Sequence, residues 1–325
     1  MTFFKKNKKI FFAVLGIAIF FLIILINKEV SWQSLTNLNY KYLALVIVFS
    51  YLATSLSAIR WGWIVNTLAN KKIIPYRKYI FYYSLGYTLG SFLGQEIVNF
   101  STSAGALLIE KVSPKKIVNA YIIDKFLNTI NLACILWVSV FYFLGLTNEK
   151  LSTVLIIISW LITYLIISYR KTNFTSLLAY LNNWLQKLAN IIPFLKNKGL
   201  TVDQPEEKII IEPKILRKMY LVSIAKFILA VTATFYTFKT LNLTIGIIKT
   251  MLALPIAQLS IVFAITPGAI GILETGWFIL LKLLGFPALE INTFLIGSRV
   301  LYYLGIIITF IASYILVLTV KKEKI

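Results

Sequence analysis

The stretch ITPGAIGILETG, residues 265–276, places a proline, three glycines and a glutamate between two apolar segments. These segments, residues 250–263 and 277–285, contain a single charged side chain, that of Lys282. As helices with a rise of about 1.5 Å per residue, they would reach roughly 20 Å at most, whereas the hydrocarbon core of a bilayer is about 30 Å thick. Neither segment is therefore expected to cross a membrane alone.

The break between the two segments rests on three residues. Pro267 has no backbone N–H to donate, and Gly268 and Gly271 adopt backbone conformations that other residues avoid, so we expect one helix to end and another to begin here. Irregular backbone at membrane depth is tolerated only where protein or a water-filled cavity surrounds it, which makes the stretch a candidate binding site. The alternative is an ordinary kinked helix in which Glu274 caps its own first turn.

The composition is that of a polytopic membrane protein. Apolar residues make up 59% of the 325-residue chain, and the mean hydropathy is +0.82. The chain has no histidine and one cysteine, Cys134, which excludes an intrachain disulfide and a metal site of the usual His/Cys type. With only 12 acidic residues, most hydrolase mechanisms are disfavoured. Because no nucleotide, metal or nucleophile motif is found either, we expect neither an enzyme nor a cofactor.

The fold is predicted to be all-α, with six full spans and two broken, re-entrant helical hairpins. The six spans are expected at residues 10–26, 42–59, 117–146, 151–169, 219–238 and 292–320. Residues 79–109 are too long and too polar in the middle for one span, so we expect two half-length helices that meet near residues 94–99. Apolar side chains recur at helical spacing over residues 174–192, which predicts an amphipathic helix on the membrane surface within the loop 170–218.

The distribution of Lys and Arg indicates the topology. If both broken regions return to the side from which they start and the amino terminus is cytoplasmic, 24 of the 33 basic residues are cytoplasmic and 6 lie outside. This bias agrees with the positive-inside rule and places both ends of the chain in the cytoplasm. Residues 1–150 and 151–325 then run in opposite orientations with the same order of elements, so residues 1–325 are predicted to be a single membrane domain built as an inverted repeat. Matching broken segments in such repeats are typical of transporters and point to the substrate site.

Ionisable side chains inside a membrane are functional candidates, because each is costly to keep there. The candidates for lipid binding are Glu96, Asp124, Lys125, Glu274 and Arg299. In each half an acid at the tip of a hairpin is followed by a cation on the next span, so we predict that Glu96 pairs with Lys125 and Glu274 with Arg299 around a polar cavity. Arg299 and Lys125 would hold a lipid phosphate, helped by free N–H groups at half-helix amino termini. Two alternatives remain. In one, the two members of each pair only neutralise each other and hold the hairpin against the neighbouring span. In the other, Asp124 and Lys125 form a local pair.

Residues 60–63, Arg-Trp-Gly-Trp, are expected at the membrane interface as an aromatic and cationic anchor at the end of a span. The basic residues that follow, up to residue 78, are interpreted as a surface facing lipid headgroups. Although a net charge of +21 would indicate nucleic-acid binding in a soluble protein, its position at the ends of apolar segments favours a membrane surface.

Two stretches together resemble a known family. Residues 266–274, TPGAIGILE, and residues 298–304, SRVLYYL, are similar to the Pro-Gly-x-x-Gly-x-x-Glu and late arginine-tyrosine pattern of the lysylphosphatidylglycerol synthase transmembrane family. That family includes the flippase half of the bacterial multiple peptide resistance factor and many stand-alone proteins. The resemblance is to a stand-alone form, since only five residues follow Val320.

The resemblance implies lipid translocation and carries five site positions over to this chain. These positions are Pro267, Gly268, Gly271, Glu274 and Arg299. The first half departs from the family pattern, because Asn99 stands where an arginine is expected, and this departure leaves the substrate open.

The expected function is that of a lipid flippase in the cytoplasmic membrane. Its substrate would be an anionic or aminoacylated phospholipid or a polyprenyl-phosphate-linked lipid, and its partners membrane lipids, without nucleic acid. One alternative is a membrane-embedded transferase that uses Glu96 or Asp124 as a base on a lipid-linked substrate. Another is a non-catalytic membrane partner of a separate synthase or glycosyltransferase, docking through residues 174–192.

Overall fold

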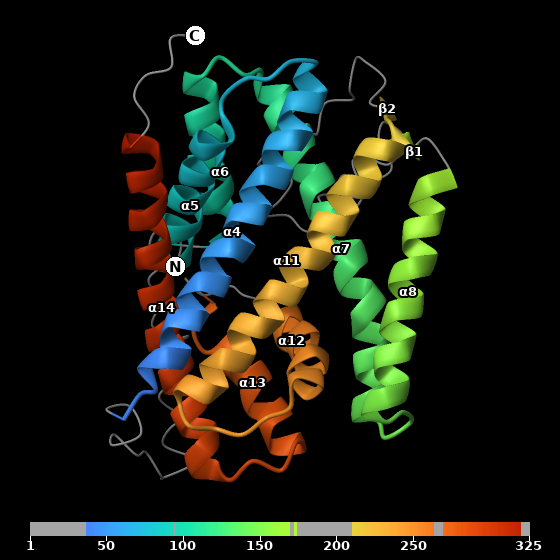
Figure 1. Cartoon of the computed structure of the whole chain (residues 1–325), viewed down its shortest axis with the longest axis vertical. Coiled ribbons are helices and arrows are strands. Elements are labelled where there is room, and N and C mark those ends of the chain that lie inside the picture. The colour runs from blue at the N-terminus through green and yellow to red at the C-terminus, as the bar shows by residue number, and fades with distance from the viewer. Residues whose placement is uncertain (1–36, 94, 170–171, 174–209, 263–268, 320–325) are drawn as a thin grey trace, which may run out of the picture.

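The computed structural model describes residues 37–319 apart from 94, 170–171, 174–209 and 263–268 (Figure 1). The helices described are α4 (Tyr40–Ala69), α5 (Tyr76–Leu93), α6 (Gln95–Ile109), α7 (Pro114–Phe143), α8 (Glu149–Tyr169), α11 (Pro213–Thr240), α12 (Ile247–Val262), α13 (Ile272–Leu283) and α14 (Ala288–Leu318). Two short strands, β1 (Thr172–Asn173) and β2 (Ile210–Ile211), pair antiparallel at the ends of the loop after α8. The span predicted at residues 10–26 and the surface helix at 174–192 lie outside the described residues.

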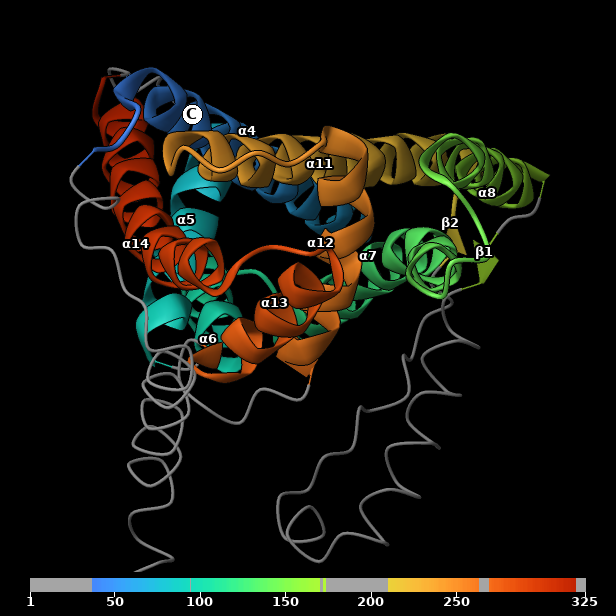
Figure 2. The same ribbon diagram turned by 90° about the horizontal axis from the view of Figure 1, so that it is seen from below.

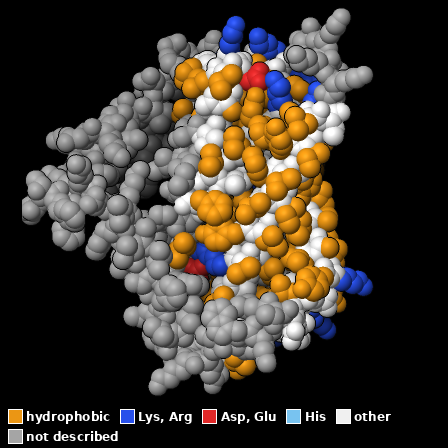
Figure 3. Space-filling view, turned by 90° about the vertical axis from the view of Figure 1, so that its left-hand side faces the viewer, with side chains coloured by type: hydrophobic (Ala, Val, Ile, Leu, Met, Phe, Trp, Pro, Cys, Tyr) orange, Lys and Arg blue, Asp and Glu red, His pale blue; other side chains and the backbone are white. Residues whose placement is uncertain are grey.

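Five helices in the described part of the chain are long and apolar enough to cross a membrane, namely α4, α7, α8, α11 and α14. They coincide with five of the six predicted spans, so the prediction of a helical, multi-pass membrane protein is confirmed. Apolar side chains cover a broad band of the face shown in Figure 3, and Lys and Arg gather toward its two ends. This arrangement suits a surface that meets lipid between two charged interfaces.

The two broken regions each form a pair of helices that pack against each other, α5 with α6 and α12 with α13. The break predicted around Pro267 is thus confirmed as two separate helices, although Pro267 and Gly268 themselves lie outside the described residues. The two pairs lie toward opposite ends of the molecule (Figure 1). Their entry into a membrane from opposite sides, and the inverted repeat, stay predictions.

An aromatic cluster fixes α13 against its neighbours. The rings of Phe238 in α11 and Phe294 in α14 stack with their centroids 4.0 Å apart, and Trp277 of α13 meets Phe294 edge-on at 5.0 Å. All three side chains are buried in one continuous apolar core. Seen from below, α4 and α11 lie side by side, and α14, α13 and α12 lie around the rest of the bundle (Figure 2). The start of α13 is therefore held beside the first turns of α14.

A close approach between α4 and α5 requires glycine at residue 62. A Cβ there would lie 2.7 Å from Tyr79 Cδ2 and 2.9 Å from Tyr79 Cγ. The Tyr79 ring is fully buried, packs edge-on against Trp61 and donates a hydrogen bond from its hydroxyl to Asn66 Oδ1, so it has no room to withdraw. We expect Gly62→Ala to lower the free energy of unfolding by about 1–3 kcal/mol, the usual cost of overpacking.

Gly105→Ala in α6 is the matched control for this prediction. Among the described residues, and apart from the adjoining backbone of α6 itself, no atom lies within 4 Å of the position that its Cβ would take. Alanine also favours a helix more than glycine does. Thermal unfolding of both purified variants in the same detergent measures the difference. Equal unfolding temperatures for Gly62→Ala and the wild type would contradict the predicted clash.

Candidate functional site

The amino terminus of α13 is built around Glu274. Gly271, with φ of +84°, precedes the helix in a conformation that favours glycine. Its backbone N–H donates a hydrogen bond to Glu274 Oε2 at 2.7 Å, which is half of a capping box. Glu274 therefore caps the first turn of its helix, as the kinked-helix alternative expected, but α12 and α13 are two separate helices and not one kinked helix. The cap uses only one of the two carboxylate oxygens.

Arg299 on α14 donates a hydrogen bond to the other carboxylate oxygen of Glu274, Oε1. Its Nε donates to Glu274 Oε1 in an ion pair, and its Nη2 donates to the backbone carbonyl of Ala269 at 3.2 Å. The predicted pairing of Glu274 with Arg299 is present in the structure. Because the guanidinium holds both the cap of α13 and the turn before it, a single side chain fixes the end of the broken segment to α14.

Burial makes this pair unusual. The Glu274 side chain is 3% exposed and that of Arg299 is 11% exposed. Removing charges from water is costly, and such pairs persist where they are hydrogen-bonded on both sides. We define Gly271, Glu274, Arg299 and the carbonyl of Ala269 as the hairpin site.

The end of α5 lies next to the hairpin site. Tyr302 and Tyr303, one turn after Arg299 on α14, both contact α5. Tyr302 shares a hydrogen bond of 3.0 Å with Ser91, and the Tyr303 ring stacks on Phe92 with a centroid distance of 4.9 Å. The first hairpin thus approaches the same level of α14 as the second. The side chain of Glu96, expected at its tip, lies outside the described residues.

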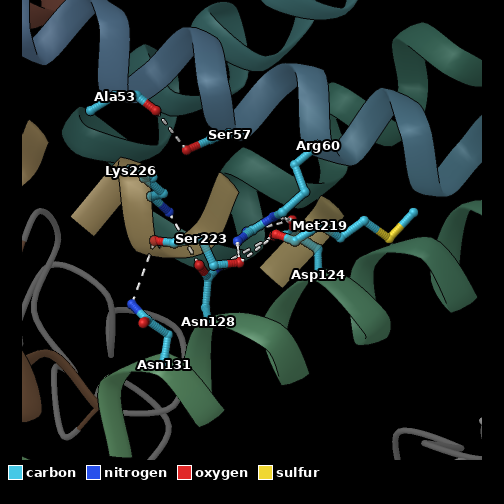
Figure 4. Close-up of polar contacts among 9 residues, drawn as sticks. All are labelled: Ala53, Ser57, Arg60, Asp124, Asn128, Asn131, Met219, Ser223 and Lys226. Carbon is cyan, nitrogen blue, oxygen red and sulfur yellow. Dashed lines mark hydrogen bonds and ion pairs between the residues drawn. The ribbon is translucent and has the colours of Figure 1, made fainter. Parts of the chain in front are cut away.

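A second polar centre joins α4, α7 and α11 (Figure 4). Arg60 Nε and Nη2 both donate to Asp124 Oδ1, at 2.8 and 2.6 Å, and Arg60 Nη1 donates to the hydroxyl of Ser223. Arg60 is 0% exposed and Asp124 4%. Three membrane-spanning helices are therefore tied by one buried ion pair and its hydrogen bonds. We call Arg60, Asp124 and Ser223 the three-helix centre.

Amide groups extend the three-helix centre toward the lower half of α7. Asn128 Nδ2 donates to Asp124 Oδ2 at 3.3 Å, and Lys226 Nζ donates to Asn128 Oδ1 at 3.4 Å. Asn131 Nδ2 reaches the backbone carbonyl of Ser223 at 3.5 Å, while its Oδ1 is buried without a hydrogen-bond partner in the described part of the chain. Both oxygens of Asp124 are consequently already engaged by protein groups.

Two interpretations of the sequence need correction here. Arg60 does not lie at the membrane interface as an anchor, because α4 continues beyond it to Ala69 and the Arg60 side chain is completely buried. Asp124 pairs with Arg60 on another helix and not with the adjacent Lys125, whose Nζ lies 5.2 Å from the centroid of the Tyr121 ring. The local Asp124–Lys125 pair is therefore wrong, and the pairing of Lys125 with Glu96 stays a prediction.

A third polar cluster lies where α6 ends. Lys78 Nζ and the hydroxyl of Tyr82 each donate to Glu110 Oε1 at 2.8 Å. Burial on its own raises the pKa of Glu110, but the hydrogen bonds from Lys78 and Tyr82 and the charge of Lys78 together outweigh it and hold the pKa of this carboxyl below its usual range. The cluster ties the first turns of α5 to the far end of the same hairpin.

This lowered pKa predicts a pH-dependent stability. The ionised form of Glu110 stabilises the fold above the pKa that Glu110 has in the unfolded chain, and that contribution is lost as the pH falls through the lower pKa of the folded state. We expect Glu110→Gln to unfold at a lower temperature than the wild type near pH 7, and the difference to shrink as the pH falls below about 4, the ordinary pKa range of a glutamate. Glu149→Gln is the control, since the exposed Glu149–Lys249 pair spans 3.8 Å and is expected to contribute little. A difference for Glu110→Gln that does not change with pH would show that the ion pair is not its cause.

Comparison with known proteins agrees with the pattern found in the sequence. No curated protein matches the chain. The family model described as the lysylphosphatidylglycerol synthase TM region matches residues 10–309. This range includes four candidate spans and most of the fifth, α14, together with both hairpins, the hairpin site and the three-helix centre. The chain therefore belongs to the lysylphosphatidylglycerol synthase transmembrane family.

Proposed function

We propose that the protein is a flippase that moves an anionic lipid across the cytoplasmic membrane. The observation that carries this proposal is the buried ion pair of Glu274 with Arg299 at the start of a broken helix. An arginine at this depth presents a planar fork of donors that matches a phosphate or carboxylate. The family to which the chain belongs is a membrane domain named for a lipid synthase, which is consistent with a lipid substrate.

The proposed step is an exchange of partners at Arg299. The headgroup phosphate takes the place of Glu274 Oε1 on the guanidinium, while Glu274 stays bound through Oε2 to the N–H of Gly271. Return of Glu274 to Arg299 then releases the lipid on the other side. Because the carboxylate competes with the phosphate, the site is never left with an unpaired buried arginine, which would be costly.

The three-helix centre has a structural role in this proposal. Its arginine is completely buried and both oxygens of Asp124 accept hydrogen bonds from side chains. A substrate hydroxyl would have to displace one of those donors before Asp124 acted as a general base. This geometry gives less support to the transferase alternative at Asp124 than the hairpin site gives to transport.

The membrane orientation is part of the proposal. Lys and Arg along the chain favour cytoplasmic termini. Because Arg60 is buried, it no longer counts among the cytoplasmic Lys and Arg residues. The remaining basic residues are still predominantly on the cytoplasmic side. The hairpin of α5 and α6 then faces the cytoplasm, and that of α12 and α13 faces the outside.

Lipid transfer in vesicles tests the proposed function. Purified protein is reconstituted into phosphatidylcholine vesicles with a fluorescent phosphatidylglycerol, an aminoacylated phospholipid or a polyprenyl phosphate in one leaflet. Movement to the other leaflet is followed by quenching, with and without a proton gradient. We expect transfer of at least one of these lipids, and a reduction of roughly ten- to a hundredfold in Arg299→Ala, because charge-assisted hydrogen bonds to the headgroup are lost.

Two results would overturn this proposal. If no anionic lipid moves under any condition, flippase activity is excluded. A change in the mass of the added lipid would then indicate a transferase, and co-purification of one stoichiometric synthase would indicate a partner protein. If lipids move equally fast in Arg299→Ala and the wild type, transport does not use the hairpin site.

A further inference from the structure

The interface between α5 and α14 contains a row of buried hydroxyl groups. Ser84 Oγ and Ser313 Oγ lie 2.9 Å apart. Further along, the hydroxyl of Tyr302 lies 3.0 Å from Ser91 Oγ and 3.2 Å from the hydroxyl of Tyr87. The three serines are at most 1% exposed. If the helices separated, every one of these groups would become available to a polar ligand. We call this interface the α5–α14 seam.

The seam connects two charged clusters. Lys78 and Glu110 form an ion pair one to two turns before Ser84, where the hairpin of α5 and α6 begins. Arg299 lies one turn before Tyr302 on α14, so both side chains occupy the same side of that helix. A headgroup that follows the seam from the first cluster therefore arrives at the guanidinium of the hairpin site.

The length of the seam fits the depth of Arg299. Its aromatic contacts run from Phe81, whose ring stacks on Phe310, to Phe92, whose ring stacks on Tyr303. Between Phe81 and Phe92 the α5 helix rises roughly 16 Å, which is about half of the hydrocarbon thickness of a bilayer. A seam of this length would lead from one membrane surface to the middle of a bilayer.

The hydrogen bonds across the seam are weaker than those at the three-helix centre. Its hydrogen bonds join neutral hydroxyl groups, whereas the three-helix centre joins α4, α7 and α11 through an ion pair and charge-assisted hydrogen bonds. Charge-assisted hydrogen bonds are about twice as strong as neutral ones. Of these two sets of polar contacts, those of the seam are the easier to exchange for contacts with a ligand.

The outer surface beside the seam suits acyl chains. Large apolar side chains on both helices are between 37% and 55% exposed there, namely Leu89, Phe92, Val300, Leu304 and Ile307. A polar row with apolar flanks matches a phospholipid, whose headgroup would lie inside while its chains stay in the bilayer. A soluble anion would gain nothing from the apolar flanks.

We propose that the α5–α14 seam is the lateral opening through which a phospholipid headgroup reaches Arg299. The hydroxyl groups of the seam exchange their contacts with one another for contacts with the phosphate and glycerol oxygens as the lipid passes. This inference rests on the proposed function and adds the path that the substrate takes to the hairpin site.

A reversible crosslink tests the seam. Ser84→Cys and Ser313→Cys are combined with Cys134→Ser, because Cys134 is the one native cysteine. The two Oγ atoms are 2.9 Å apart, so oxidation or a short bifunctional thiol reagent can join the new side chains. In phosphatidylcholine vesicles with a trace of fluorescent phosphatidylglycerol, we expect transfer to be about tenfold slower or more after oxidation than in the same sample after reduction, because the gating step is blocked.

The matched control joins a pair outside the seam. Thr147 Oγ1 and Ser152 Oγ are also 2.9 Å apart, at the turn between α7 and α8. Thr147→Cys with Ser152→Cys, again with Cys134→Ser, should transfer lipid at the same rate when oxidised and reduced. Intact mass before and after reduction confirms that each crosslink has formed.

Each outcome is decisive. Equal rates before and after reduction of the seam crosslink, with transfer still dependent on Arg299, would overturn the seam and leave the proposed function intact. If the wild type transfers no lipid, the proposed function fails, and the seam is then judged by uptake of phosphatidylglycerol into delipidated protein, counted by native mass spectrometry. Lower uptake by the oxidised protein would support the seam as a lipid site, and equal uptake would overturn it.

Discussion

Replacing Arg60 with alanine is expected to lower the free energy of unfolding by about 3–5 kcal/mol. The reason is that Asp124 would keep a buried negative charge without the cation that neutralises it. The substitution also removes the hydrogen bond to Ser223 and so loosens α11 from α4. Equilibrium unfolding in mixed micelles, followed by tryptophan fluorescence, measures the loss.

A double substitution separates the cost of an unpaired charge from the general importance of the position. Arg60→Met combined with Asp124→Leu leaves no buried charge in the three-helix centre. Because apolar side chains of similar volume often replace a buried ion pair without loss, we expect the double variant to recover most of the stability lost by Arg60→Ala. Ser223→Ala should cost about 1.5–3 kcal/mol, as for one hydrogen bond to a charged group. If Arg60→Ala alone is as stable as the wild type, the ion pair does not hold these helices together.

The sequence predicts the five described spans because the length of an apolar run is local information. An apolar run of about 20 residues needs no partner to be recognised as a span. The break before α13 was predictable for a similar reason. Proline fixes its own φ and glycine widens the range of backbone conformations wherever they occur, as at Pro267 and Gly271. The pairing of Glu274 with Arg299 followed from assigning the acid to the break and the cation to the next span.

Arg60 was missed because its role depends on a distant part of the chain. Its partner Asp124 is 64 residues away, on α7. Without that partner a buried arginine is too costly, so ending the span at residue 59 and placing Arg60 at the interface was the reasonable interpretation. One signal was available: small side chains occur before and after it, at Ser57, Ala58 and Gly62, as expected where helices pack closely in a membrane.

The sequence also does not predict which group accepts the hydrogen bond from Arg299 Nη2. The carbonyl of Ala269 reaches the guanidinium because Ala269 has a positive φ of 55°, which is uncommon for a residue other than glycine. Such a conformation depends on the surrounding packing and is not encoded by the residue itself. Side-chain charges are visible in a sequence, whereas the direction of a backbone carbonyl in an irregular turn is not.

Glu274→Gln is expected to change lipid transfer in a way that distinguishes it from Arg299→Ala. Glutamine keeps an oxygen that can accept the hydrogen bond from Gly271, so the cap of α13 is retained. It loses the negative charge that competes with the lipid phosphate for Arg299. We therefore expect the variant to bind anionic lipid roughly ten- to a hundredfold more tightly, and to transfer it more slowly because release is impaired.

The contrast with Arg299→Ala is the test of the exchange step. Without the guanidinium, both binding and transfer should fall, whereas Glu274→Gln should raise binding and lower transfer. Bound phosphatidylglycerol is counted by native mass spectrometry and transfer is followed in vesicles, with Glu149→Gln as a carboxylate control away from the site. If Glu274→Gln loses binding as Arg299→Ala does, the carboxylate contacts the lipid or supports the fold and does not compete with the phosphate. An increase in binding without slower transfer would mean that release from Arg299 does not limit the rate.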